Sequence, residues 1–389
     1  MDAFENVRRQ FPVCQSSTYL DCAYDCGGSL FSRASAEEYY NDWHKAAAKG
    51  LKGGPGRQPF FDRAEALRQK ICTLTGGQSP REVCFTRNTN EGINHILLGF
   101  QGFGPGSAVM TSSIEHPSVL MPCINASHMR GFECIVLEPE NGEYPTAQMY
   151  MKAWTPRVKM IVLSHVQSSN GYKTDLEALG AFCREKGVWL VVDAIQSLGF
   201  GPFDASKWGV SAVSAAGYKG LMACESTGFL WCRRDLLEMT APTYTAAGFV
   251  MGSQRGEKGW EITCRDKKDA RKFENSSLDA PGIYSLDAGI SCVLGLGVNN
   301  ISEHIRGLYD VLYNGLLDLG ITPVTPLSPG ESCASIAFDT PKRPQLQEIF
   351  EKRNISCSFS RLIRLSLGAF NNEDDIKAVL SAVKEVLEE

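Results

Sequence analysis

The chain has 389 residues, of which 43% are hydrophobic and 21% are charged, and its net charge at pH 7 is −5. These values are typical of a globular protein that is long enough to bury a large core in two domains. The acidic balance argues against a nucleic acid or an anionic membrane as a partner. No apolar run reaches about 18 residues, so the sequence predicts no transmembrane helix.

The N-terminus has no apolar segment of the kind found in signal peptides, which predicts a cytoplasmic protein whose thiols stay reduced. The 14 cysteines are scattered along the chain. The nearest pair, Cys22 and Cys26, has a Cys-x3-Cys spacing with no histidine or second pair close behind it. We therefore expect no metal site, and we expect most cysteines to be small buried hydrophobic residues.

Helical patterns occupy residues 34–47 and 60–75, with apolar residues at helical spacing in the second. Between them, residues 49–57 are rich in glycine and are expected to form a flexible loop. This loop lacks the spacing Gly-x4-Gly-Lys-Ser/Thr and a preceding strand, which are the marks of a phosphate-binding loop. A surface loop or a loop that covers substrate is the better interpretation.

A short strand at residues 82–86 leads into Arg87-Asn-Thr89-Asn90-Glu91, which opens another helix. Small polar residues at a helix N-terminus leave backbone N–H groups free, and the helix dipole favours an anion there. The same residues would also serve as a simple N-terminal cap. The pattern by itself leaves both interpretations open.

Strands are predicted at residues 108–113, 132–137 and 158–168, the last of them ending in polar groups, and a capped helix at residues 175–187. His116 follows the first of these strands, and a lone histidine in that position is more often structural than catalytic. His165, at the end of the third strand, is expected to be structural. The alternation of strands and helices predicts βαβ units and a mostly parallel sheet.

The stretch from residue 188 to residue 219 is the centre of the prediction. Residues 188–192 form an unbroken apolar run that ends in Asp193, as expected for a strand buried on both faces. A second strand of small residues ends at Lys219 beside glycines. Parallel sheets bind ligands beyond their carboxyl ends. An acid that keeps a pyridine nitrogen protonated, and a lysine that forms a Schiff base, are what pyridoxal phosphate chemistry requires. A helix cap and a solvated lysine remain the alternative for these two residues alone.

The surrounding residues resemble a known family. Asp193-Ala-Ile-Gln196-Ser-Leu-Gly199, Ser214-Ala-Ala-Gly-Tyr-Lys219 and the segment after Ser226 resemble the class V aminotransferases. The resemblance is closest to the branch that holds isopenicillin N epimerase-like proteins, cysteine desulfurases and carbon–sulfur lyases. It implies an α/β type I pyridoxal phosphate fold, with a mostly parallel seven-stranded sheet flanked by helices and a smaller α+β C-terminal domain. The implied cofactor is pyridoxal 5′-phosphate.

The resemblance also implies how the cofactor is held. Lys219 would form the Schiff base, Asp193 would contact the ring nitrogen, and the His116 imidazole would stack on the ring. Thr89 and Asn90 would bind the phosphate, although Asn90 stands where a threonine is more usual.

Other positions depart from the family pattern. Ser168 occupies the column in which relatives have an asparagine that contacts the ring hydroxyl, with Asn170 two residues later as the alternative, and Gln196 resembles the second partner. Tyr218 replaces a histidine and could reach the phosphate, whereas Ala216 replaces a serine and removes a contact.

Two further sites follow from the resemblance. Ser276 or Ser277 would reach the phosphate of a neighbouring subunit, so a homodimer with a shared active site is expected. Arg364, in an Arg-x-Ser strand, would grip the α-carboxylate of an amino-acid substrate with two hydrogen bonds. An exposed strand arginine is the alternative.

The expected organisation is an N-terminal arm at residues 1–30, a large cofactor-binding domain at residues 31–260 and a small domain at residues 261–389. The small domain would begin with a long helix at residues 285–319. Its strands would lie at residues 333–338 and 363–367, and a closing helix at residues 373–387.

The leading hypothesis for function is a lyase that eliminates from the Cβ–S bond of a cysteine-derived substrate, with Lys219 as base at Cα. Epimerisation and transamination of an α-amino acid share the same early steps and remain alternatives. Cys357 lacks the His-His-Cys pattern of cysteine desulfurases, so sulfur transfer to a persulfide is not expected. A relative that binds the cofactor without turnover is the last alternative.

Overall fold

The structure is a computed structural model that describes residues 3–51, 54–139, 144–244, 249–256, 259–274 and 276–388. A seven-stranded sheet lies at its centre, with the strand order β2-β8-β7-β6-β5-β3-β4. Only β8 runs antiparallel to its neighbours, so the predicted α/β fold with a mostly parallel sheet is confirmed. The strands are β2 (Val83–Thr86), β3 (Ala108–Ser112), β4 (Glu133–Leu137), β5 (Val158–Ser164), β6 (Trp189–Asp193), β7 (Ala212–Ala216) and β8 (Gly228–Cys232).

The central strands are buried on both faces because helices cover both. In β6, Val191 belongs to one hydrophobic cluster, whereas Leu190 and Val192 belong to the other, as the alternation of side chains along a strand requires. The helices α5 (Thr89–Gly99) and α6 (Pro117–Arg130) pack on the first cluster. The helices α4 (Gly54–Thr75), α8 (Leu176–Lys186) and α11 (Ala280–Leu296) pack on the second.

Two sequence predictions about helices were wrong. The helix α4 begins at Gly54, so the last four residues of the predicted loop 49–57 are helical; residues 52 and 53 lie outside the described part. The first N–H groups of a helix have no partner within it, so glycine and proline are tolerated in this turn. The predicted long helix 285–319 is two helices, α11 and α12 (Val298–Asp318), which meet at 78°. Gly297 permits the break because it adopts φ 83°, where a side chain would be strained.

A smaller α+β unit follows α12. Its sheet has the order β11-β14-β13, built from β11 (Ser335–Phe338), β13 (Ser358–Phe359) and β14 (Ile363–Ser366). The helix α13 (Arg343–Lys352) packs against α14 (Glu373–Glu388), and its Phe350 ring lies against Phe359 of β13. The N-terminal segment joins this unit, because β1 (Thr18–Tyr19) pairs with β12 (Ile355–Ser356) and Arg8 lies 2.7 Å from Asp375.

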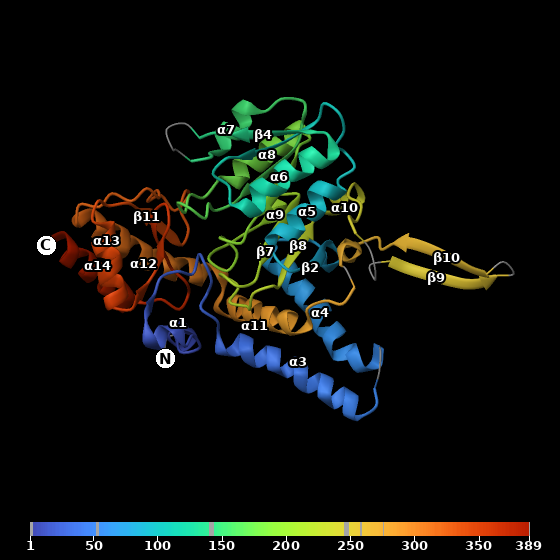
Figure 1. The fold of residues 1–389 in the computed structure, drawn as a ribbon, viewed down its shortest axis with the longest axis horizontal. Coiled ribbons are helices and arrows are strands. Elements are labelled where there is room, and N and C mark those ends of the chain that lie inside the picture. Colours follow the sequence, from blue (N-terminus) through green and yellow to red (C-terminus); the bar gives the residue numbers. More distant parts are fainter. Residues whose placement is uncertain are drawn as a thin grey trace.

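Figure 1 shows both chain termini on the side of α12, α13 and α14. The helix α3 (Leu30–Ala48) runs along the opposite edge of the large unit from α7 (Ala147–Ala153). The hairpin of β9 (Phe249–Gly256) and β10 (Gly259–Asp266) projects from the body. No single helix in the described ranges is long and apolar enough to cross a membrane, although the bent pair α11–α12 passes the same test together. The domain bounds inferred from the sequence stay a prediction.

Candidate active site

A small cavity, with about 390 Å³ of open space when its mouth is included, lies at the carboxyl ends of β5, β6 and β7, next to the N-terminus of α5. Parallel strands bring their carboxyl ends to one edge, so residues far apart in the sequence meet there. Seven of the side chains predicted from the sequence line this cavity: Thr89, His116, Ser168, Asp193, Gln196, Tyr218 and Lys219.

Asp193 ends β6 and is only 3% exposed. Burial raises the pKa of this carboxyl to about 6. A hydrogen bond from the backbone N–H of Ile195 and the nearby Lys219 cation both act in the opposite direction. A cationic group placed beside Asp193 would therefore favour the ionised form of this carboxyl.

Lys219 follows β7 and is 7% exposed. Burial lowers the pKa of its amine to about 8, although Asp193 raises it. The turn that carries this lysine needs glycine at two positions. A Cβ on Gly217 would lie 2.8 Å from a methyl carbon of Leu286, and one on Gly220 would lie 2.4 Å from the Leu198 carbonyl oxygen. A buried amine with a pKa near neutrality can act as a nucleophile or a base.

His116 caps the N-terminus of α6, where its Nδ1 accepts a hydrogen bond from the Ser118 N–H at 3.1 Å. In the neutral ring the proton therefore lies on Nε2. Burial lowers the pKa of His116, and the cations Lys219 and Arg364 lower it further. The site thus holds an uncharged imidazole at the end of β3.

Thr89 lies at the first position of α5 and is 3% exposed. Its Oγ1 is buried and has no hydrogen-bond partner among the described residues. Asn88, which the sequence analysis missed, caps the helix by accepting from the Glu91 N–H at 2.9 Å and also lines the cavity. An unpaired hydroxyl at a helix N-terminus fits a phosphate group.

Asn90 does not line the cavity. Its Nδ2 donates to the Ser118 carbonyl at 3.5 Å, and its Oδ1 accepts from Asn94 at 3.0 Å. The described contacts of this side chain are therefore with Ser118 of α6 and Asn94 of α5. Ser118 lines the cavity itself and was another residue that the sequence analysis missed.

The two candidates for the ring-hydroxyl contact are separated by the structure. Ser168 lines the cavity. Asn170 accepts from the Tyr172 N–H at 3.1 Å, and its carbonyl accepts from Thr325, so it serves the loop instead. Gln196 lines the cavity and donates from Nε2 to the Ala23 carbonyl at 2.9 Å.

Arg364 lies in β14 and reaches the edge of the cavity without lining it. Its Nη1 donates to the carbonyl of Ser168, and its Nη2 lies 3.3 Å from Asp21 Oδ1. Arg364 shifts the pKa of both His116 and Lys219, so its charge acts at the same site.

Ser276 and Ser277 are both exposed and line no part of this cavity. Ser277 borders a separate hollow with Arg87 and Thr227. Within a single chain, these two serines therefore do not line the cavity of Lys219.

Glu115 is a buried acid that the sequence analysis did not single out. It accepts hydrogen bonds from the Ser164 N–H at 2.9 Å and from Gln167 Nε2 at 2.8 Å. Burial raises the pKa of this carboxyl to about 8. The sequence feature that could have identified Glu115 is its position directly before His116 and shortly after a predicted strand. Within the described ranges, no group of three or more His, Cys, Asp and Glu side chains is placed to hold a metal ion.

The chain is similar to known proteins along most of its length. Residues 33–379 match the model of the family Aminotransferase class-V. A probable cysteine desulfurase of Methanothermobacter thermautotrophicus is 26% identical over 300 residues, which cover 77% of this chain and 72% of that protein. An uncharacterized aminotransferase of Bacillus subtilis, YcbU, is 23% identical over 381 residues, 97% of each chain.

Solved structures share the fold. The apo cysteine desulfurase of Thermococcus onnurineus has a TM-score of 0.87 at 21% identity, over 100% of this chain and 99% of that one. The cystine C–S lyase C-DES, solved with its reaction product cysteine persulfide, has a TM-score of 0.84 at 20% identity, over 97% and 99%. Because the family match spans most of the sequence, this chain belongs to the class V aminotransferase family and is a pyridoxal phosphate-dependent enzyme of the type I fold.

Proposed function

We propose that this protein is a lyase that breaks the Cβ–S bond of a cysteine-derived amino acid by β-elimination. The observation that carries the proposal is the arrangement of Lys219, Asp193 and Arg364 at one edge of the sheet. A base, an acid partner for a cofactor ring and a carboxylate-binding cation meet there.

The residues of the cavity fit pyridoxal phosphate. Thr89 Oγ1 is a buried donor without a partner among the described residues, and it lies at the N-terminus of a helix where a phosphate is favoured. Asp193 is a buried carboxylate suited to a protonated ring nitrogen, and Lys219 is a buried amine suited to an aldehyde. When bound, the cofactor supplies an aldehyde that condenses with amines and a ring that accepts electrons from Cα.

The chain supplies proton transfer and orientation. Lys219 has a lowered pKa, so a useful fraction of its amine is neutral near pH 7 and can take the proton from Cα. Asp193 keeps a negative charge buried opposite the developing electron density. The Nδ1 of His116 is engaged with the Ser118 N–H, which leaves Nε2–H as an uncharged donor at the same edge of the sheet.

Arg364 binds the substrate in this proposal. Its guanidinium is oriented from two sides, by the Ser168 carbonyl and by Asp21. A planar guanidinium pairs with a carboxylate through two hydrogen bonds, which selects an α-amino acid and fixes its Cα relative to Lys219.

Cys357 separates the lyase from a desulfurase, which is what several relatives are named. Burial raises the pKa of this thiol far above its ordinary value, with Asp21 adding to the effect. A thiol that stays protonated is a poor acceptor of sulfur, because the thiolate is the reactive form. This favours release of the sulfur product over its transfer to the enzyme.

The test is to incubate the purified holoenzyme with cysteine, cystine and cysteine S-conjugates and to measure pyruvate and ammonia. The proposal expects both products in equal amounts from at least one of these substrates. Exchange of deuterium at Cα without product would replace it with epimerisation. Conversion of the cofactor to its amine form with release of a keto acid would replace it with transamination. An absorbance spectrum that no amino acid changes would leave only a binding protein.

We also propose that the working form is a cytoplasmic homodimer. Ser276 and Ser277 are exposed in the single chain, which leaves them available to a neighbouring subunit. Sedimentation of the holoenzyme tests the dimer. A Ser276→Ala, Ser277→Ala variant should weaken cofactor retention if these hydroxyls reach the neighbour's phosphate.

A further inference from the structure

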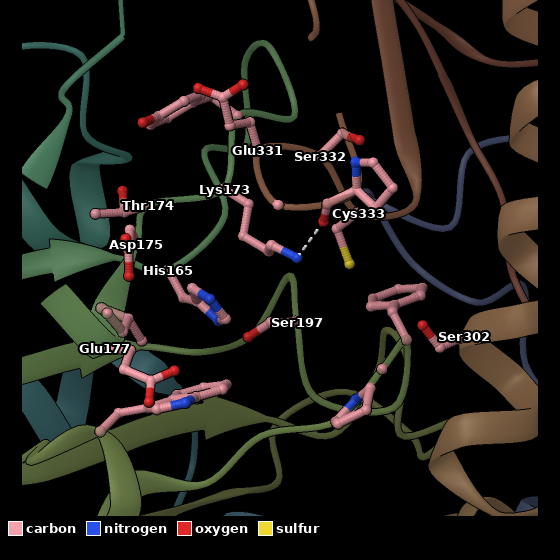
Figure 2. A pocket seen from close by; sticks show the side chains of 18 of the residues that line it. His165, Lys173, Thr174, Asp175, Glu177, Ser197, Ser302, Glu331, Ser332 and Cys333 are labelled. Carbon is pink, nitrogen blue, oxygen red and sulfur yellow. Dashed lines mark hydrogen bonds between the residues drawn. The ribbon is translucent and has the colours of Figure 1, made fainter. Parts of the chain in front are cut away.

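A second and larger hollow shares no lining residue with the cavity of Lys219. Figure 2 shows this hollow from close by. Successive residues divide between the two spaces. Val166 and Gln196 line the cavity of Lys219, whereas His165 and Ser197 line this hollow. The open volume is about 1560 Å³, including the space at its mouth. Its walls come from the loops after β5 and β6, from α12 and from the segment before β11.

The Lys173 ammonium extends into this hollow (Figure 2). It donates to the Pro329 carbonyl at 2.6 Å, which uses one of its three N–H groups. No other described residue accepts a hydrogen bond from the remaining N–H groups of Lys173. A lysine held at one point in this manner presents a fixed positive charge.

The His165 ring extends toward the same space (Figure 2). The residue is 4% exposed, and its ring packs edge-on against Phe203 and Trp208. Burial lowers the pKa of His165 to about 3, so the ring is neutral. Neither ring nitrogen has a hydrogen-bond partner among the described residues. Because Nδ1 is closed to solvent, Nε2 is the ring nitrogen left to meet a ligand or an ordered water in the hollow.

The acids at the border do not neutralise Lys173. Asp175 caps α8 by accepting from the Ala178 N–H at 2.9 Å, and Glu177 lies 3.4 Å from Lys207. The Glu331 carboxylate points away from Lys173 (Figure 2). The centre of the hollow is therefore bounded by a cation and an uncharged ring, and the Phe200 side chain supplies an apolar wall.

We infer that this hollow is a binding site for a small carboxylate, with the ligand's anionic group between Lys173 and His165 and its apolar part against Phe200. A single carboxylate suits one ammonium and one neutral N–H donor better than a doubly charged anion does. The inference does not depend on the proposed lyase activity, because no residue that lines the hollow also lines the cavity of Lys219.

Cys333 provides the measurement, because its half-buried thiol lies at the border of the same hollow. The holoenzyme is labelled with N-ethylmaleimide, and the rate at each cysteine is read by mass spectrometry. Acetate and pyruvate are the probes, and sodium chloride at equal ionic strength is the control. We expect both carboxylates to slow labelling of Cys333 in a saturable manner and to leave the exposed Cys224 unaffected.

The variants locate the protection. Lys173→Met should raise the concentration of acetate for half-protection by about tenfold or more, the effect of losing a charged hydrogen bond. Because Lys173 also holds Pro329, His165→Phe is the second variant; it keeps the aromatic packing and removes the ring nitrogens. Arg364→Ala should leave the protection unchanged. Protection that is absent, or that is the same in both hollow variants as in the unaltered protein, would overturn the inference.

Discussion

Asp21 and Arg364 form an ion pair of 3.3 Å although 343 residues separate them in the sequence. The N-terminal segment is held in place for this contact, because the Ala23 N–H donates to Ser366 Oγ at 2.8 Å and its carbonyl accepts from Gln196. The guanidinium of Arg364 is thereby oriented before substrate arrives, and its Nε is buried without a partner among the described residues. The group that is proposed to bind the substrate carboxylate is therefore oriented by the protein itself.

Arg364→Lys should lower kcat/KM by ten- to a hundredfold, about 1.5–3 kcal/mol, mainly through a higher KM. Lysine keeps the positive charge but loses the planar pair of donors, so carboxylate binding weakens in the ground state and the transition state alike. Steady-state kinetics on the best substrate measures the effect. The exposed Arg361→Lys is the matched control and should change nothing. An unaltered KM in Arg364→Lys would remove this residue from substrate binding.

Local patterns predicted a mostly parallel sheet and put Asp193 and Lys219 at the ends of two strands, but they left the role of the pair open. An apolar run that ends in an acid, and a small-residue strand that ends in a lysine, are read from neighbouring residues. The carboxyl-end rule then brings them together, because parallel strands share one edge. The seven-stranded sheet was implied by the family resemblance, and its strand order comes from the structure alone.

The rest depends on contacts that local patterns do not contain. Nothing near Asp21 in the sequence indicates that it meets Arg364. Asn88 lines the cavity and Asn90 does not, because their side chains leave the start of α5 in different directions. A sequence motif does not specify which of two such neighbouring residues faces the cavity. The bend at Gly297 was missed because apolar periodicity continues through it, and only the positive φ reveals the break.

The capture of pyridoxal phosphate by the apoenzyme should accelerate as pH rises, with a midpoint near 8. Only the neutral amine attacks an aldehyde, and burial lowers the pKa of Lys219 to about 8. The rate is measured by the growth of cofactor absorbance from pH 6 to pH 10. Asp193→Asn should move the midpoint lower, because Asp193 favours the charged amine. A midpoint near 10.5, the ordinary value for lysine, would show that Lys219 is not the amine that reacts.

The free energy of unfolding of the apoprotein should fall between pH 5 and pH 8, in part because of Glu115. Burial raises the pKa of this carboxyl from 4.5 to about 8, so the folded protein holds a proton that the unfolded chain has lost. Stability therefore decreases as pH rises through this window, by at most about 1.4 kcal/mol for each pH unit. Glu115→Gln cannot ionise and should flatten the dependence, as urea unfolding at several pH values would reveal. Equal slopes in the two proteins would contradict the assignment.

His116 is expected to combine a packing role with a proton-transfer role, which two variants separate. His116→Phe keeps a ring and loses the Nε2–H, so kcat should fall by about a hundredfold while cofactor affinity is retained. His116→Ala loses both and should also release the cofactor more readily. Equilibrium dialysis gives the affinity, and stopped-flow absorbance gives the rate of the proton-transfer step. If His116→Phe keeps full activity, the imidazole acts by packing alone.

Cys357→Ser distinguishes a lyase from a desulfurase in a single comparison. The thiol is half-buried and partial burial raises its pKa, so we expect it to remain protonated and to accept no sulfur. The variant should keep at least half of the unaltered rate with cysteine, and the carbon product should be pyruvate in both proteins. The exposed Cys224→Ser is the control for general effects of removing a thiol. If alanine is formed instead, if activity is lost in Cys357→Ser, and if mass spectrometry finds an extra sulfur on Cys357, then this side chain receives the sulfur and β-elimination is not the reaction.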